Sequence, residues 1–185
     1  MKVDANIREE TSDLLAPWTY RSTELFELET ELLFKQQWML AGHCNDIPER
    51  GDYLTFDAFD ERALVVRGKD GEIRAFHNVC KHRGGKILDQ SSGRCPGSLT
   101  CPFHGWTYAL DGRLQGVPRI DTFRQLDISA VALNSVALEI WLGFIFIRFR
   151  TPETSARSVA EQMAPVTSDV MPYKPEQLEP LLPAS

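Results

Sequence analysis

Residues 76–85 read FHNVCKHRGG, and residues 101–112 read CPFHGWTYALDG. Each stretch places one thiol and one imidazole close together in the chain. The four side chains are Cys80, His82, Cys101 and His104. Glycines follow both pairs, so the backbone can come close to a bound group and donate N–H hydrogen bonds to it.

Two cysteines and two histidines, one of each from two loops, match the ligand set of a Rieske 2Fe–2S cluster. We expect Cys80 and Cys101 to hold one iron, and His82 and His104 to hold the other. Neutral imidazoles donate less charge than thiolates, so the histidine-bound iron is the more easily reduced. Such clusters have potentials of roughly −150 mV or above, against about −400 mV for plant-type clusters with only cysteine ligands.

A structural zinc site also uses two cysteines and two histidines. Its ligand pairs are usually separated by two or more residues, whereas only Lys81 lies between Cys80 and His82. The spacing therefore favours the cluster. A zinc-stabilised binding module remains as the alternative without redox chemistry.

With both stretches in view, the sequence resembles the Rieske domain in the large subunit of ring-hydroxylating, non-haem iron oxygenases. The resemblance extends from about Tyr20 to Arg150. It implies that electrons arrive from a ferredoxin or a flavin-dependent reductase. They would leave for a mononuclear Fe(II) in the catalytic domain of the same or a neighbouring subunit. It also implies that the full-length protein is a homotrimer or a higher oligomer.

The mononuclear iron of that family needs two histidines and one carboxylate. Only His43 and His77 remain after the cluster ligands are assigned, and both precede the first ligand loop. We therefore expect the Fe(II) site in a catalytic domain missing from this chain, which alone would not activate dioxygen. A free-standing Rieske ferredoxin, an electron carrier without a catalytic domain, is the alternative.

Three segments are expected along the chain: a flexible arm at 1–19, a Rieske domain at 20–150, and a linker at 151–185 that begins the missing catalytic domain. A helix is predicted from Ser22, its N-cap, to about Trp38. Its apolar residues share one helical face at Leu25, Leu28 and Leu32. A second short helix is indicated by the spacing of Val159, Met163 and Val166.

Short apolar or alternating runs separated by turn residues predict a mostly β fold, a small antiparallel barrel or sandwich. The ligand loops are expected at hairpin tips. The predicted strand segments are 52–56, 62–68, 73–79, 98–101, 105–110, 136–142 and 144–149.

Composition excludes several classes of protein. A hydrophobic fraction of 43% is ordinary for a globular domain, and a net charge of −6 argues against binding to nucleic acid or anionic membranes. No apolar run approaches the length of a membrane span, so a cytoplasmic location is expected. In that compartment Cys44 and Cys95 are predicted to be free thiols, with a disulfide between them as the alternative.

Overall fold

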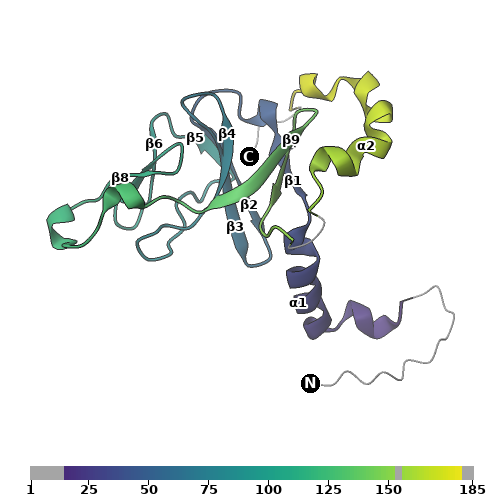
Figure 1. Cartoon of the computed structure of the whole chain (residues 1–185), viewed down its shortest axis with the longest axis horizontal. Helices are drawn as coiled ribbons and strands as arrows, with labels where there is room; N and C mark the ends of the chain where they lie inside the picture. Colours follow the sequence, from purple (N-terminus) through teal and green to yellow (C-terminus); the bar gives the residue numbers. More distant parts are fainter. Residues whose placement is uncertain (1–14, 153–155, 181–185) are drawn as a thin grey trace.

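The computed structural model describes residues 15–152 and 156–180, and antiparallel strands dominate it (Figure 1). Its helices and strands are α1 (Thr23–Leu32), β1 (Met39–His43), β2 (Asp52–Ala58), β3 (Glu61–Arg67), β4 (Ile73–His77), β5 (Ser92–Arg94), β6 (Ser98–Thr100), β7 (Thr107–Ala109), β8 (Leu114–Gly116), β9 (Ser135–Trp141), β10 (Phe144–Arg148) and α2 (Val159–Val170). In this part of the chain, seven strands form one sheet in the order β1-β10-β9-β4-β3-β2-β5, and three form a second in the order β6-β7-β8. The predicted mostly β fold is confirmed.

Strand β3 lies between two hydrophobic clusters. Leu64 and Val66 belong to the cluster that reaches the ligand loops, while Ala63 and Val65 belong to the cluster closed by β9 and β10. All four side chains are fully buried. Because successive side chains of a strand point to opposite faces, a continuous apolar run is what a strand covered on both faces requires.

The two ligand loops are attached to the sheets in different ways. The second loop joins β6 to β7, which pair with each other, and is therefore a hairpin tip as predicted. The first loop leaves β4 and leads to β5, which pairs with β2. It is closed by the buried side chain of Asn78, which accepts hydrogen bonds from Ile87 N and Leu88 N, both at 3.0 Å, and donates one to Leu88 O at 2.7 Å.

Helix α1 is shorter than predicted. It ends at Leu32 rather than near Trp38, and Phe34–Gln36 form a 3-10 turn, η2. The carbonyl of Lys35 accepts a hydrogen bond from Arg150 N at 2.8 Å. This contact with a distant segment draws the chain out of helical geometry, which sequence periodicity alone does not reveal.

The start of α1 is as predicted, but the helix does not bury its apolar face. The Ser22 hydroxyl caps the helix by accepting a hydrogen bond from Leu25 N at 3.1 Å. Leu28 and Leu32 are 54% and 57% exposed, whereas Thr30 is buried. The polar side of α1 therefore faces the body of the protein.

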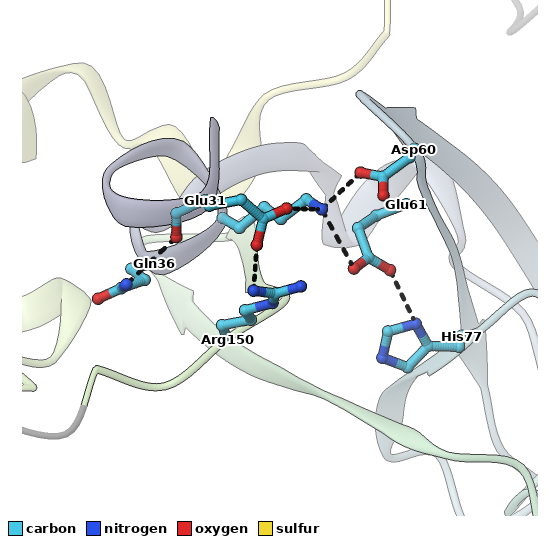
Figure 2. A network of polar contacts seen from close by, with 7 residues as sticks. Glu31, Gln36, Asp60, Glu61, His77 and Arg150 are labelled. Atoms are coloured by element: carbon cyan, nitrogen blue, oxygen red, sulfur yellow. Dashed lines mark hydrogen bonds and ion pairs between the residues drawn. The ribbon is translucent and has the colours of Figure 1, made fainter. Parts of the chain in front are cut away.

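A network of charged side chains holds that polar side (Figure 2). Lys35 is fully buried, and its Nζ lies 2.6 Å from Glu31 Oε1 and 2.5 Å from Asp60 Oδ1. Burial alone would lower the pKa of Lys35, but the hydrogen bonds to Asp60 and Glu31 outweigh it and raise the pKa. Glu61 extends the network to His77 Nδ1 at 3.4 Å, so His77 has a carboxylate neighbour that its sequence spacing did not indicate.

Replacing Lys35 with methionine should destabilise the protein by on the order of 1–3 kcal/mol. This cost is below the range typical of breaking a fully buried ion pair, because the carboxylates of Glu31 and Asp60 are partly exposed to water. Urea unfolding of both proteins measures the change. Lys69→Met, at an exposed lysine on the β3–β4 turn, is the control and should leave the midpoint unchanged. Equal midpoints for the two variants would contradict this role of Lys35.

The segment that follows β10 returns to the sheet. Val159 at the start of α2 is buried, and its N–H donates to Glu139 Oε2 at 2.6 Å. Further along, Asn45 Nδ2 donates to Glu176 O at 3.2 Å and to Leu178 O at 2.7 Å. The predicted second helix is confirmed, and it packs against the strands.

Of the predicted flexible arm, residues 1–14 lie outside the described residues, and Pro17–Tyr20 form a 3-10 turn. Within 15–152 and 156–180, no helix has both the length and the apolar character needed to cross a bilayer.

Candidate metal centre

The two ligand loops share one backbone hydrogen-bond pattern. The N–H of Cys80 and the N–H of Cys101 each bond the carbonyl five residues later, both at 2.8 Å. The carbonyls of these cysteines accept from Gly84 N at 2.9 Å and from Gly105 N at 3.0 Å. Both glycines have a left-handed φ, 73° and 71°, which glycine adopts without strain. The loops therefore present their cysteines equivalently, although the histidine follows after two residues in the first loop and after three in the second.

The two loop thiols are buried together. Cys80 and Cys101 are 3% and 2% exposed and lie close enough for a hydrogen bond between them. The hydroxyl of Tyr108 lies 3.2 Å from Cys80 Sγ. Cys44 and Cys95 are free thiols in the structure, as predicted.

The two imidazoles lie in contact with each other but differ in exposure. The ring centroids of His82 and His104 are 4.7 Å apart, with an interplanar angle of 83°. His82 stacks on Trp106, with ring centroids 5.0 Å apart and an interplanar angle of 7°. Phe123 makes a T-shaped contact with the ring of His82 and another with the ring of Trp106. His104 is exposed, whereas His82 is half-buried. Of the two imidazoles, His104 is therefore the one more open to solvent.

A cavity of about 320 Å³ opens between the loops and is lined by Cys80, His82, Arg83, Gly84, Gly85, Cys101, Phe103 and His104. In the described part of the chain, His82 Nδ1 is buried and has no hydrogen-bond partner. A buried polar atom without a partner is costly, and a bound metal would satisfy it. The residues therefore fit a cluster that takes thiolate and imidazole ligands.

The four side chains line one cavity and come from two loops. Among the described residues, no three His, Cys, Asp or Glu side chains are placed to hold one metal ion. A structural zinc ion needs four ligands around one centre, whereas each iron of a 2Fe–2S cluster takes two from the protein. Two pairs of side chains around one cavity suit the second arrangement.

Burial sets the protonation of these groups in the protein without metal. It raises the pKa of the Cys101 thiol. Hydrogen bonds from the backbone N–H groups of Phe103 and His104 oppose part of this rise. Burial also lowers the pKa of His82, helped by the neighbouring His104 and Arg83. His82 is therefore neutral near pH 7, the form that binds metals, and metal binding at Cys101 releases a proton.

Sequence reasoning did not single out Tyr108, Asn78 or Phe123. Tyr108 is 28 residues from Cys80, and Asn78 acts on a backbone segment ten residues further along. Their partners lie in other segments of the fold, so no local sequence pattern identifies them. For Tyr108, the available signal in the sequence was the pair of aromatic residues in GWTY, which directly follows His104.

This fold and this arrangement of thiols and imidazoles define an iron–sulfur protein. The family model of the Rieske [2Fe-2S] domain matches residues 37–133. The chain belongs to this family.

Curated relatives are oxygenase subunits. The chain is 34% identical to the carnitine monooxygenase oxygenase subunit of Acinetobacter baumannii over 144 residues, which is 78% of this chain and 38% of the relative. It is 41% identical to the glycine betaine monooxygenase oxygenase subunit of Chromohalobacter salexigens over 128 residues, 69% of this chain and 28% of the relative. The chain thus spans well under half the length of these relatives.

Solved structures agree. The quaternary ammonium Rieske monooxygenase CntA in complex with L-carnitine superposes with a TM-score of 0.73 at 32% identity, covering 84% of this chain and 43% of that one. A naphthalene 1,2-dioxygenase from Rhodococcus bound to indole gives a TM-score of 0.71 at 32% identity, covering 78% and 33%. The fold is that of the Rieske domain of oxygenases.

Proposed function

We propose that Cys80 and Cys101 bind one iron of the Rieske cluster, and that His82 and His104 bind the other. The domain would take up single electrons and deliver them to a non-haem iron held outside these 185 residues. The cluster supplies a one-electron redox centre. The observation that carries the proposal is the buried, unpartnered His82 Nδ1 beside the cavity that both cysteines line.

The chain's own residues orient the ligands and exclude water. Trp106 stacks on His82 and is 5% exposed, so it fixes the imidazole plane and covers one side of it. Burial of Cys80 and Cys101 keeps solvent from the sulfurs. His104 is the exposed ligand, and a redox partner that approaches the cavity meets it first.

The wider proposal concerns partners and assembly. A ferredoxin or a flavin-dependent reductase would supply electrons, and the catalytic domain of the same or a neighbouring subunit would accept them. We place residues 151–185 at the entry to that domain. The full-length protein would be a homotrimer or higher oligomer in the cytoplasm. The oxygenase-subunit names of the relatives support this reading over the free-standing ferredoxin.

Anaerobic reconstitution with iron and sulfide tests the cluster assignment. The expected product is brown, contains two irons and two acid-labile sulfides per chain, and gives a rhombic EPR signal after dithionite reduction. A colourless protein that binds zinc and no sulfide would overturn the proposal.

A second test separates the oxygenase from the carrier. A reading frame that continues past residue 185 into a domain with two histidines and a carboxylate at one site supports the oxygenase. A stop codon at that position would support the ferredoxin instead.

A further inference from the structure

Four exposed basic residues flank the ligand loops and form a basic face: Lys81, Arg83, Arg119 and Arg124. The first two lie on either side of His82 in the first loop, and Arg83 lines the ligand cavity. The other two come from the segment that follows β8. In the described part of the chain, none of the four forms an ion pair with a carboxylate. Their charges are therefore not neutralised within the domain.

The two arginines after β8 are held beside the cavity by their neighbours in the chain. Pro118 lies against Gly105 of the second loop, since a Cβ placed on that glycine would be 3.0 Å from Pro118 Cγ. Phe123 contacts the ring of His82, with centroids 5.8 Å apart. One arginine directly follows each of these two residues, so both belong to the surface around the proposed cluster.

The charge of this surface is opposite in sign to that of the whole chain. Residues 79–88, 101–110 and 117–125 carry five basic side chains and one acidic side chain, Asp121, in a chain with a net charge of −6. The fifth basic residue, Lys86, pairs with Asp57 at 2.9 Å. Helix α1 carries four glutamates and no basic residue, and it lies at the opposite end of the molecule from β6 and β8 (Figure 1). The domain is therefore an electric dipole whose positive end holds the ligand loops.

Exposed apolar side chains lie in the same segments as the basic face. Phe103, next to His104, is 65% exposed, and its ring packs over Gly85 of the first loop. Val79 and Ile120 are 38% and 42% exposed. Apolar groups together with a polar, charged rim are the usual composition of a protein interface.

We propose that the basic face docks an acidic redox protein, which delivers single electrons to the cluster. This inference rests on the proposed function and names the kind of donor. A separate donor must arrive by diffusion, and attraction between opposite charges speeds that encounter and orients the partner. The proposed acceptor belongs to the same assembly and needs no such steering. One electron leaves the reduced donor and enters the oxidised cluster, and no covalent bond forms or breaks.

Stopped-flow reduction of the reconstituted chain by two donors of opposite charge tests the proposal. With an acidic plant-type ferredoxin, reduced beforehand, the rate constant should fall as NaCl is added, because salt screens the attraction. With the methyl viologen radical, a cation, it should rise. If the net charge of −6 governed the encounter instead, both trends would be reversed. A ferredoxin rate constant that is unchanged or raised by salt would overturn the inference.

Charge reversal locates the effect. Arg119→Glu combined with Arg124→Glu should slow reduction by the ferredoxin about tenfold at low salt and speed reduction by methyl viologen. A change in cluster potential would move both rates in the same direction, so opposite changes isolate the surface charge. Arg50→Glu combined with Lys69→Glu is the matched control, at exposed residues near the β3–β4 turn, the end of β4 away from the first loop. Equal effects of the two double variants would contradict docking at the basic face.

Calorimetry measures docking without electron transfer. The oxidised ferredoxin is titrated into the oxidised, reconstituted chain at low salt. The double variant at Arg119 and Arg124 should bind about tenfold more weakly than the wild type. Equal dissociation constants would overturn the inference.

The two proposals fail in distinguishable ways. If the wild-type chain holds no iron and sulfide, the cluster assignment fails. If it holds both but its reduction ignores salt and the charge reversals, only the docking of an acidic donor fails.

Discussion

Cys101→Ser should abolish cluster assembly, whereas Cys95→Ser should leave the visible spectrum intact. Cys101 is buried close to Cys80 and lines the ligand cavity. Cys95 lies elsewhere, with its N–H bonded to Gly51 O at 2.8 Å. Serine is close to cysteine in shape but is a poor ligand for iron, so the comparison isolates the sulfur. Iron and acid-labile sulfide content after reconstitution measures the effect.

The two variants also test whether the iron ligand is Cys101 or Cys95. The two cysteines are only six positions apart, and histidine follows Cys101 three residues later. Circular dichroism of both variants controls for loss of the sheet. Bleaching in Cys95→Ser with retained colour in Cys101→Ser would mean that the ligands had been assigned to the wrong residue.

His82→Cys should give a cluster with a lower reduction potential, by on the order of 100 mV, because a thiolate adds negative charge where a neutral imidazole stood. All-cysteine plant-type clusters lie near about −400 mV, and a single exchange should move the potential part of the way there. Protein-film voltammetry measures the shift directly. His77→Cys, outside the cavity, is the control and should not change the potential.

A potential that stays at the wild-type value in His82→Cys would contradict the role of this histidine. Loss of the rhombic EPR signal of the wild type would accompany the expected shift. The stacked Trp106 ring should remain in place, because Phe123 also packs against it.

The sequence predicted those features that depend on local pattern. The two pairs of proposed ligands and the strands of the β2–β3–β4 meander are each encoded within a few consecutive residues. The buried face of α1 was not predictable in this way. Lys35 is drawn toward Asp60, and its carbonyl meets Arg150, which is remote in sequence. Contacts of this kind override a helical apolar pattern.

The comparisons limit what this domain says about substrate. Relatives named for carnitine, glycine betaine and biphenyl oxygenation match with 34%, 41% and 42% identity. Proteins named for quaternary ammonium compounds and for an aromatic hydrocarbon therefore share this domain at similar levels of identity. The identity of the matched segment therefore does not distinguish between these classes of substrate.

Because His82 and His104 differ in solvent exposure, a partner can approach this site more closely from one side than from the other. Trp106 and Phe123 pack against His82, whereas His104 is exposed to solvent. Tunnelling rates fall steeply with distance, so a second redox centre gains a short path only when it arrives from the open side. The rate of electron transfer in a complex would then depend on the orientation of the partner as well as on its affinity.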